Sequence, residues 1–174
     1  MLAEHKNGRQ VSVRNLSAAD EPALRAMLDR LSRETIYSRF HAPYPRVPEP
    51  MLAHLMGYAD GRSVVAVAGD DVVGHAMYAG ASGEAEMAIV VEDGWQSIGV
   101  GKLLLAGLAL RAAGRGIATF TGLALGENRH VLGLADAVFA GARRTLKDGS
   151  YEMSMPLGGL RPAPEGGREA RPAA

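Results

Sequence analysis

A glycine-rich turn and a carboxylate stand close together in the middle of the chain, within EAEMAIVVEDGWQSIGVGKLLL (residues 84–105). The turn carries the pattern Q-x-x-G-x-G, formed by Gln96, Gly99 and Gly101, and it separates an apolar strand-like stretch from a helix-like run. Glycines let the backbone approach phosphate oxygens closely, and the first turn of a helix presents unpaired N–H groups to an anion. The stretch therefore predicts a phosphate-binding loop at a helix N-terminus.

Glu86 is the candidate for proton transfer, because it precedes this loop on the apolar stretch. Its neighbours Ala85 and Met87 would partly desolvate the carboxylate, which raises the pKa of a glutamate and makes it a better base. The alternative is a solvated residue near the start of a strand. Glu84 and Glu92 are weaker candidates, because one begins the strand and the other lies in a polar turn.

The other titratable residues give weaker indications. His75 lies on a strand among apolar residues, which favours a packed, hydrogen-bonded imidazole over a catalytic one. Arg33 and Arg39 flank Ile36 and Tyr37 and could shape the acceptor side, but the preferred interpretation is that they are surface charges on a solvated loop. The chain has no cysteine, and no set of His, Asp and Glu has metal-ligand spacing, so no metal is expected.

Composition excludes several classes of protein. The 174 residues carry 19 basic and 19 acidic side chains, which gives no electrostatic footprint for nucleic acid. The longest apolar run near the central helix, LLLAGLAL (residues 103–110), is too short to span a bilayer, and MLAEHKNGRQ is no signal peptide. A cytoplasmic protein without membrane or nucleic-acid partners is the expectation.

The periodicity of apolar residues predicts an α/β (α+β) chain with a central, mixed but mostly antiparallel sheet of about seven strands and four helices. The segment 32–50 holds four prolines after Phe40 and is expected to be an ordered loop. Residues 1–9 are expected to form an N-terminal extension, 10–157 one domain, and 158–174 a disordered Pro- and Gly-rich tail. The strands are expected at 11–16, 62–69, 72–79, 84–91, 118–125, 141–146 and 151–157, and the helices at about 20–31, 50–56, 100–113 and 128–139.

This order of elements, with Q-x-x-G-x-G at its centre, resembles the GNAT acetyltransferase fold between Val11 and Leu157. Within that superfamily the chain is most similar to bacterial protein lysine acetyltransferases, through SRETIYSRF, AEMAIVVEDGWQSIGVGKLLL and DGSYEMSMPL. The resemblance implies acetyl-CoA as co-substrate, with its pantetheine arm paired to the strand before the loop and its pyrophosphate held by the loop amides. The cofactor residues so implied are Ile89, Val90, Val91, Gln96, Ser97, Ile98, Gly99, Val100, Gly101, Lys102 and Asn128.

The resemblance also points to Glu86 as the general base of an N-acetyltransferase acting by direct attack in a ternary complex. Many members of the superfamily carry a tyrosine acid about two turns after the position of Asn128. Here that place reads Leu134-Ala135-Asp136, so either solvent or another group must protonate the leaving thiolate.

Three functions stay open from the sequence. The preferred acceptor is a protein lysine, with an acyl-CoA synthetase-type enzyme as one candidate partner. The alternatives are a small-molecule amine N-acetyltransferase and a non-catalytic acyl-CoA-binding regulatory module. Either a monomer or a homodimer is compatible with the sequence.

Overall fold

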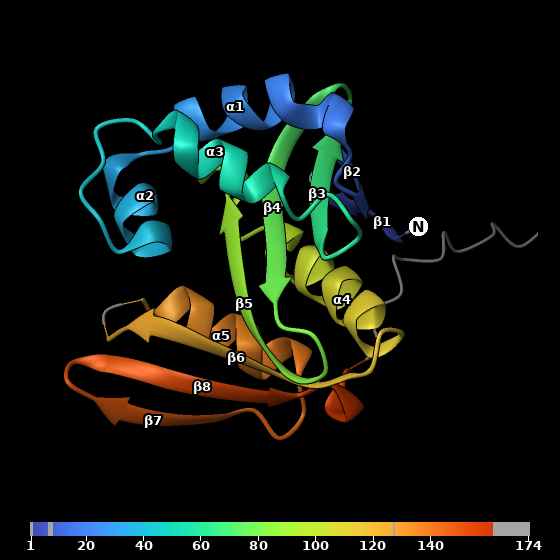
Figure 1. Ribbon diagram of the computed structural model, residues 1–174, viewed down its shortest axis with the longest axis vertical. Helices are drawn as coiled ribbons and strands as arrows, with labels where there is room; N and C mark the ends of the chain where they lie inside the picture. The colour runs from blue at the N-terminus through green and yellow to red at the C-terminus, as the bar shows by residue number, and fades with distance from the viewer. Residues whose placement is uncertain (1, 7–8, 127, 162–174) are drawn as a thin grey trace, which may run out of the picture.

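An eight-stranded sheet in the order β1-β2-β3-β4-β5-β6-β8-β7 runs through the molecule (Figure 1). The computed structural model describes residues 2–6, 9–126 and 128–161. Neighbouring strands are antiparallel except β5 and β6, which are parallel because helix α4 connects them as a crossover. The strands are β1 (Leu2–Lys6), β2 (Arg9–Asn15), β3 (Ser63–Ala68), β4 (Asp71–Ala79), β5 (Gly83–Val91), β6 (Ile117–Leu125), β7 (Arg143–Lys147) and β8 (Ser150–Pro156).

Helices cover both faces of this sheet and divide the core into two clusters. Helices α4 (Val100–Ala113) and α5 (Arg129–Val138) pack on one face, and α1 (Glu21–Asp29), α2 (Arg33–Phe40) and α3 (Glu49–Met56) pack on the other. Three 3-10 turns, at Ala18–Asp20, Asp93–Trp95 and Leu157–Gly159, complete the elements. Within the described ranges, no helix combines the length and apolar character needed to cross a bilayer.

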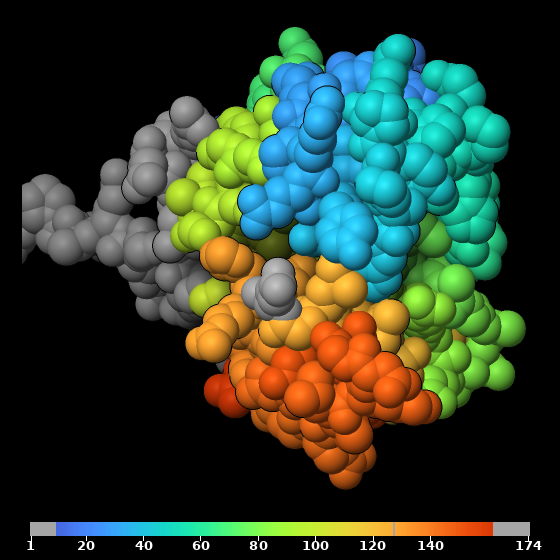
Figure 2. Space-filling view, turned by 90° about the vertical axis from the view of Figure 1, so that its left-hand side faces the viewer, coloured from blue at the N-terminus to red at the C-terminus, as the bar shows by residue number. Residues whose placement is uncertain are grey.

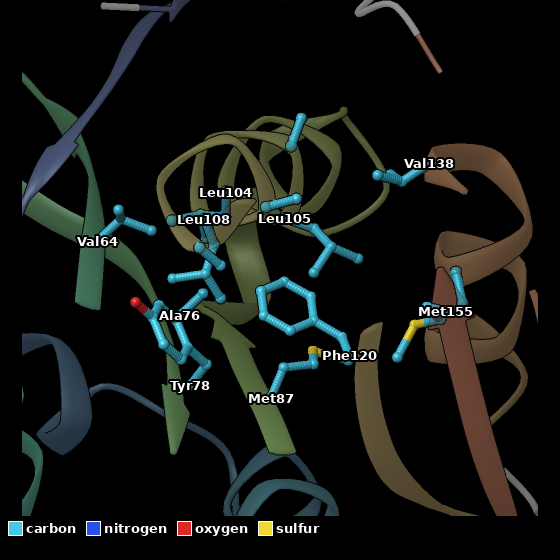
Figure 3. Packing of buried hydrophobic residues seen from close by; sticks show 14 of the residues in the cluster. Val64, Ala76, Tyr78, Met87, Leu104, Leu105, Leu108, Phe120, Val138 and Met155 are labelled. Atoms are coloured by element: carbon cyan, nitrogen blue, oxygen red, sulfur yellow. The ribbon is translucent and has the colours of Figure 1, made fainter. Parts of the chain in front are cut away.

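The first cluster joins α4 to the middle of the sheet (Figure 3). Leu104, Leu105 and Leu108 of α4 are fully buried against the aromatic rings of Tyr78 and Phe120, whose centroids lie 5.8 Å apart. Burying such side chains stabilises a fold by about 1.5–3 kcal/mol each. The cluster therefore fixes α4, and with it the loop at its N-terminus, against the strands.

Gly107 explains how closely α4 approaches the sheet. A Cβ atom built at this position would lie 3.0 Å from Cγ1 of Val13 on β2. Glycine in a helix interior costs about 1 kcal/mol relative to alanine. That cost is offset here by a close contact between helix and strand that a side chain would obstruct.

A fully buried histidine lies on β4. His75 has no exposed surface, and its Nε2 lies 2.6 Å from Oγ of Ser63 on the neighbouring strand. Burial and, to a smaller extent, the nearby charge of Arg39 together lower the pKa of His75 to about 3. The imidazole is therefore neutral and hydrogen-bonded, as the sequence indicated.

The predicted fold class is confirmed, with one strand and one helix more than expected. Strand β1 falls in the expected N-terminal extension and pairs with β2. Helix α2 replaces the first part of the expected loop, and the Ser32 side chain caps it by accepting a hydrogen bond from Thr35 N at 3.1 Å. Of the expected tail, residues 158–161 are described, and Leu160 bridges to Phe139; residues 162–174 lie outside the described ranges.

Candidate active site

The site is built where two parallel strands separate. Strands β5 and β6 pair from Gly83↔Ile117 to Glu86↔Thr121, and the ladder stops there. Beyond that point β6 continues only against β8, while β5 continues only against β4, and Figure 1 shows the two strands diverging. One edge of β5 over residues 87–91 is thus open to pair with an extended ligand, as a missing strand would.

The loop after β5 is shaped to present backbone N–H groups. Ser97 and Gly99 have positive φ angles of 61° and 101°, and Gly99 forms the N-cap of α4. Within the described part of the chain, the first backbone N–H of α4 that donates a hydrogen bond is that of Leu103, to Gly99 O at 3.2 Å, and the N–H groups of residues 97–102 have no backbone acceptor. Together with the helix dipole, these donors form an anion-binding cradle that fits a pyrophosphate.

Gln96 shapes this loop through its side chain. Its Nε2 donates to Val91 O at 3.0 Å and to Oγ1 of Thr35 at 3.2 Å, and its own N–H donates to Asp93 O at 3.2 Å. In this conformation that N–H is already used, so the row of free donors begins at Ser97. The prediction that Gln96 also contacts the cofactor stays a prediction.

Asp93 ties helix α2 to the same loop. Its carboxylate accepts hydrogen bonds from Ser32 N at 2.9 Å, Ser32 Oγ at 2.7 Å and Thr35 Oγ1 at 2.8 Å. Burial raises the pKa of Asp93, but the hydrogen bonds from Ser32 and Thr35 outweigh it and hold the pKa below its usual value. The network fixes the start of α2 beside the phosphate cradle.

A cleft of about 940 Å³ collects most of the predicted cofactor residues. In Figure 2 it is the hollow between the blue residues of α2 and the orange residues of α5. Asn128 lines it and caps α5, its Oδ1 accepting from Val131 N at 3.2 Å. Val100 and Ile98 do not line it: Val100 is buried in the first core cluster and Ile98 packs against that cluster, so each could contribute only its backbone. The cleft is lined by Ile89, Val90, Val91, Gln96, Ser97, Gly99, Gly101, Lys102 and Asn128, among others.

Glu86 lies at the point where the strands separate. It lines the cleft and also a second cavity of about 500 Å³ over β6, β8 and β7. The residues Thr121, Ser154 and Arg143 follow it in one cross-strand row, because each is the register partner of the next. Glu86 is exposed, so the burial of its carboxylate that the apolar strand indicated is absent.

Arg39 is the residue whose place the sequence did not reveal. It was interpreted as a surface charge, but its side chain is partly buried and lines the cleft. Its Nε is fully shielded from solvent and makes no hydrogen bond to any described residue. Burial lowers the pKa of Arg39 to about 10, and the charge of Glu86 opposes that shift. The sequence would have indicated the place of Arg39 only if α2 had a clear pattern of apolar residues at helical spacing, and that pattern is weak.

Comparison with known proteins identifies the family of this chain. The family model described as the acetyltransferase (GNAT) family matches residues 24–136. The chain belongs to this family. The point where β5 and β6 separate, the loop after β5 and helix α4 all fall within the matched residues.

Solved structures agree with this assignment. The GNAT domain of S. lividans PAT is 25% identical, with a TM-score of 0.78 over 90% of this chain and 94% of that one. A GNAT superfamily phosphinothricin acetyltransferase from Sinorhizobium meliloti, in complex with AcCoA, is 20% identical, with a TM-score of 0.64 over 84% and 88% of the two chains. The ribosomal-protein-S18-alanine N-acetyltransferase from Escherichia coli is 22% identical, with a TM-score of 0.61 over 89% and 97%.

No curated protein sequence matches the chain. The family match confirms the expected enzyme class, an acetyl-CoA-dependent N-acetyltransferase with acetyl-CoA as co-substrate. The open edge of β5 and the free loop donors fit that co-substrate. Because the similar structures differ in their named acceptors, the acceptor is taken up below as a proposal.

Proposed function

We propose that this GNAT enzyme acetylates a primary amine, preferably the side chain of a protein lysine, with Glu86 as general base. The observation that carries the proposal is the place of Glu86, which lines both cavities where β5 and β6 separate. A group there faces the thioester from one cavity and the amine from the other. Ile89, Val90 and Val91 would hold the pantetheine arm, and the free N–H groups of the loop would hold the pyrophosphate.

The chemistry requires a base because a lysine amine, with a pKa of about 10.4, is protonated near neutral pH. Glu86 takes a proton from the ammonium, directly or through water, and the nitrogen then attacks the carbonyl carbon of the thioester. Backbone N–H groups at the open edge of β5 stabilise the oxyanion. The nitrogen then loses its second proton to solvent, and the intermediate collapses with loss of the CoA thiolate. Solvent protonates this thiolate, since a thiol has a pKa of only about 8.5.

The resemblance to protein lysine acetyltransferases and the second cavity both support a protein acceptor. That cavity opens on the exposed face of β6, β8 and β7 and is lined by polar residues such as Thr145 and Glu152. A lysine side chain presented by another protein, for example an acyl-CoA synthetase-type enzyme, would reach Glu86 across this face. A small-molecule amine is the second candidate, because phosphinothricin acetyltransferases are among the similar structures.

We also place this activity in the cytoplasm, because a chain without cysteine suits a reducing compartment. We further propose that this protein acts as a monomer or a homodimer. Cell fractionation and sedimentation of the purified protein test these two statements.

The experiment is turnover of acetyl-CoA against a panel of lysine-bearing proteins and small amines, with Glu86→Gln as the variant. We expect kcat to fall by about 10²- to 10⁴-fold, while acetyl-CoA affinity is retained, because the cradle is untouched. Glu84→Gln, an exposed glutamate on the same strand, is the matched control and should keep full turnover. Unchanged turnover of Glu86→Gln across the pH range removes Glu86 as the base, and absence of thiol release with every acceptor favours the non-catalytic module.

A further inference from the structure

Arg39 carries a charge that the described residues leave without a partner. Its Nε is shielded from water and donates no hydrogen bond to them, and no carboxylate among them lies within ion-pair distance of its guanidinium. A buried charge is costly unless it is paired and hydrogen-bonded. Charged groups retained in such positions are commonly part of a functional site.

In the described structure, none of the acidic residues that line the cleft, Glu34, Glu86 and Asp93, forms an ion pair with Arg39. Asp93 is engaged by Ser32 and Thr35. Glu86 acts on Arg39 through its charge but forms no ion pair with it in the described structure. The Phe40 ring, whose centroid lies 4.9 Å from Cζ of Arg39, fixes the guanidinium plane without neutralising it.

The position of Arg39 assigns it to the acceptor end of the cleft. It lies on the last turn of α2, whereas the phosphate cradle lies at the start of α4, where Lys102 adds a second cation. Two titratable groups are electrostatically coupled to Arg39: Glu86, which lines the same cleft, and His75, which is neutral. Arg39 thus stands beside the proposed base, not beside the free amides that suit a pyrophosphate.

We propose that Arg39 binds a carboxylate of the acceptor, so that the preferred acceptor is a primary amine with a carboxylate beside it. This rests on the function proposed above, and in a protein acceptor it means a lysine with a neighbouring Asp or Glu. The planar guanidinium suits a carboxylate because it can donate two parallel hydrogen bonds. Glu86 would then face the amine while Arg39 faces the anion, which fixes the orientation of the acceptor.

The test uses two peptides that are identical except for Glu or Gln beside the lysine. The native enzyme should prefer the Glu peptide by about 10- to 100-fold in kcat/KM, the effect of one charge-assisted hydrogen-bonded pair. In Arg39→Gln that ratio should fall to within about twofold of one, through a higher KM for the Glu peptide, while turnover of the Gln peptide changes little. Arg39→Lys should restore part of the preference, and Arg33→Gln, an exposed arginine on the same helix, should leave it intact.

Two further measurements distinguish a role in acceptor binding from a purely structural role of Arg39. If Arg39 only stabilised α2, then Arg39→Met would lower the melting temperature; we expect it to stay the same or rise, because an unpaired buried charge is removed. Weaker acetyl-CoA binding by Arg39→Gln would assign the residue to the cofactor and overturn the proposal. An unchanged peptide preference in Arg39→Gln would overturn it as well.

A failure of the Arg39 proposal can also be told apart from a failure of the proposed lysine acceptor. If neither peptide is acetylated, the lysine acceptor is wrong, and L-methionine and L-methioninamide replace the peptides as a matched pair of amines. A preference for methionine that Arg39→Gln abolishes supports the inference even then. Equal turnover of the two amines, or none of either, overturns it.

Discussion

Replacing Asp93 with alanine tests whether the hydrogen bonds of its side chain hold α2 against the loop that forms the phosphate cradle. The carboxylate accepts three hydrogen bonds of 2.7–2.9 Å from Ser32 and Thr35, and Thr35 in turn accepts from Gln96 of the loop. Alanine removes both acceptor oxygens and with them the three hydrogen bonds, so the start of α2 is held only by its own cap, by the Gln96–Thr35 hydrogen bond and by packing. The two segments should then open independently.

The size of the effect follows from these contacts. Hydrogen bonds to a charged group contribute about 1.5–3 kcal/mol when buried, but Asp93 is exposed, so solvent screening reduces each to about 0.5–1 kcal/mol. Three such bonds give about 2 kcal/mol, which corresponds to roughly a 30-fold larger open population of α2. Because the pKa of Asp93 lies below its usual value, the link is complete above about pH 4 and weakens as pH falls through the lowered pKa.

Hydrogen exchange read by mass spectrometry measures this directly. In Asp93→Ala, peptides covering residues 33–40 should exchange roughly 30-fold faster, whereas those covering 21–29 should keep their rate. Asp70→Asn, an exposed aspartate in the turn between β3 and β4, is the control and should change neither. Equal exchange of residues 33–40 in the variant and the native protein would show that packing alone holds α2, and the coupling would be refuted.

Two more predictions concern stability. His75 is neutral in the folded protein, with a pKa of about 3, so between pH 6.5 and that value only the unfolded chain binds this proton. The free energy of unfolding should therefore fall by up to about 1.4 kcal/mol for each pH unit below 6.5, until the folded pKa is reached. Urea titrations of His75→Gln should lack this slope, and those of His130→Gln, an exposed control, should keep it. Ser97 holds a left-handed φ of 61°, so Ser97→Val should cost about 1–2 kcal/mol and weaken acetyl-CoA binding while Ser97→Gly does neither, and equal unfolding midpoints for the two variants would contradict that reading.

The central strand, loop and helix could be predicted from sequence because each local preference there agrees with the final structure. Apolar residues continue through β5, glycine stands where φ is positive at Gly99, and Gly107 marks the close approach of α4 to Val13. The residues on the cofactor side of the site were proposed one by one from the resemblance to the GNAT fold, and the glycine loop was predicted from its own sequence. The backbone at residues 87–91 is open to a ligand because the β5–β6 ladder ends at Glu86. The predicted parallel crossover indicated that these two strands pair, but not at which residue the pairing stops.

The acceptor side could not be predicted in this way. Helix α2 has one buried residue, Ile36, and little apolar periodicity, so tertiary hydrogen bonds to Asp93 and the Ser32 cap hold it in place. Strand β1 has no β-branched residue and depends on pairing with β2. The burial of Arg39 follows from α2 lying over the sheet, and the exposure of Glu86 follows from β6 turning away, so neither is encoded by neighbouring residues.

The open edge of β5 makes the sheet incomplete without its co-substrate. A ligand that pairs with residues 87–91 supplies the backbone partners of an absent strand, and it binds the folded chain only. At a hundredfold excess over its dissociation constant, such a ligand adds about 2.7 kcal/mol to the free energy of unfolding. We therefore expect acetyl-CoA, if it pairs with β5 as proposed, to slow the unfolding and proteolysis of this protein as its concentration rises.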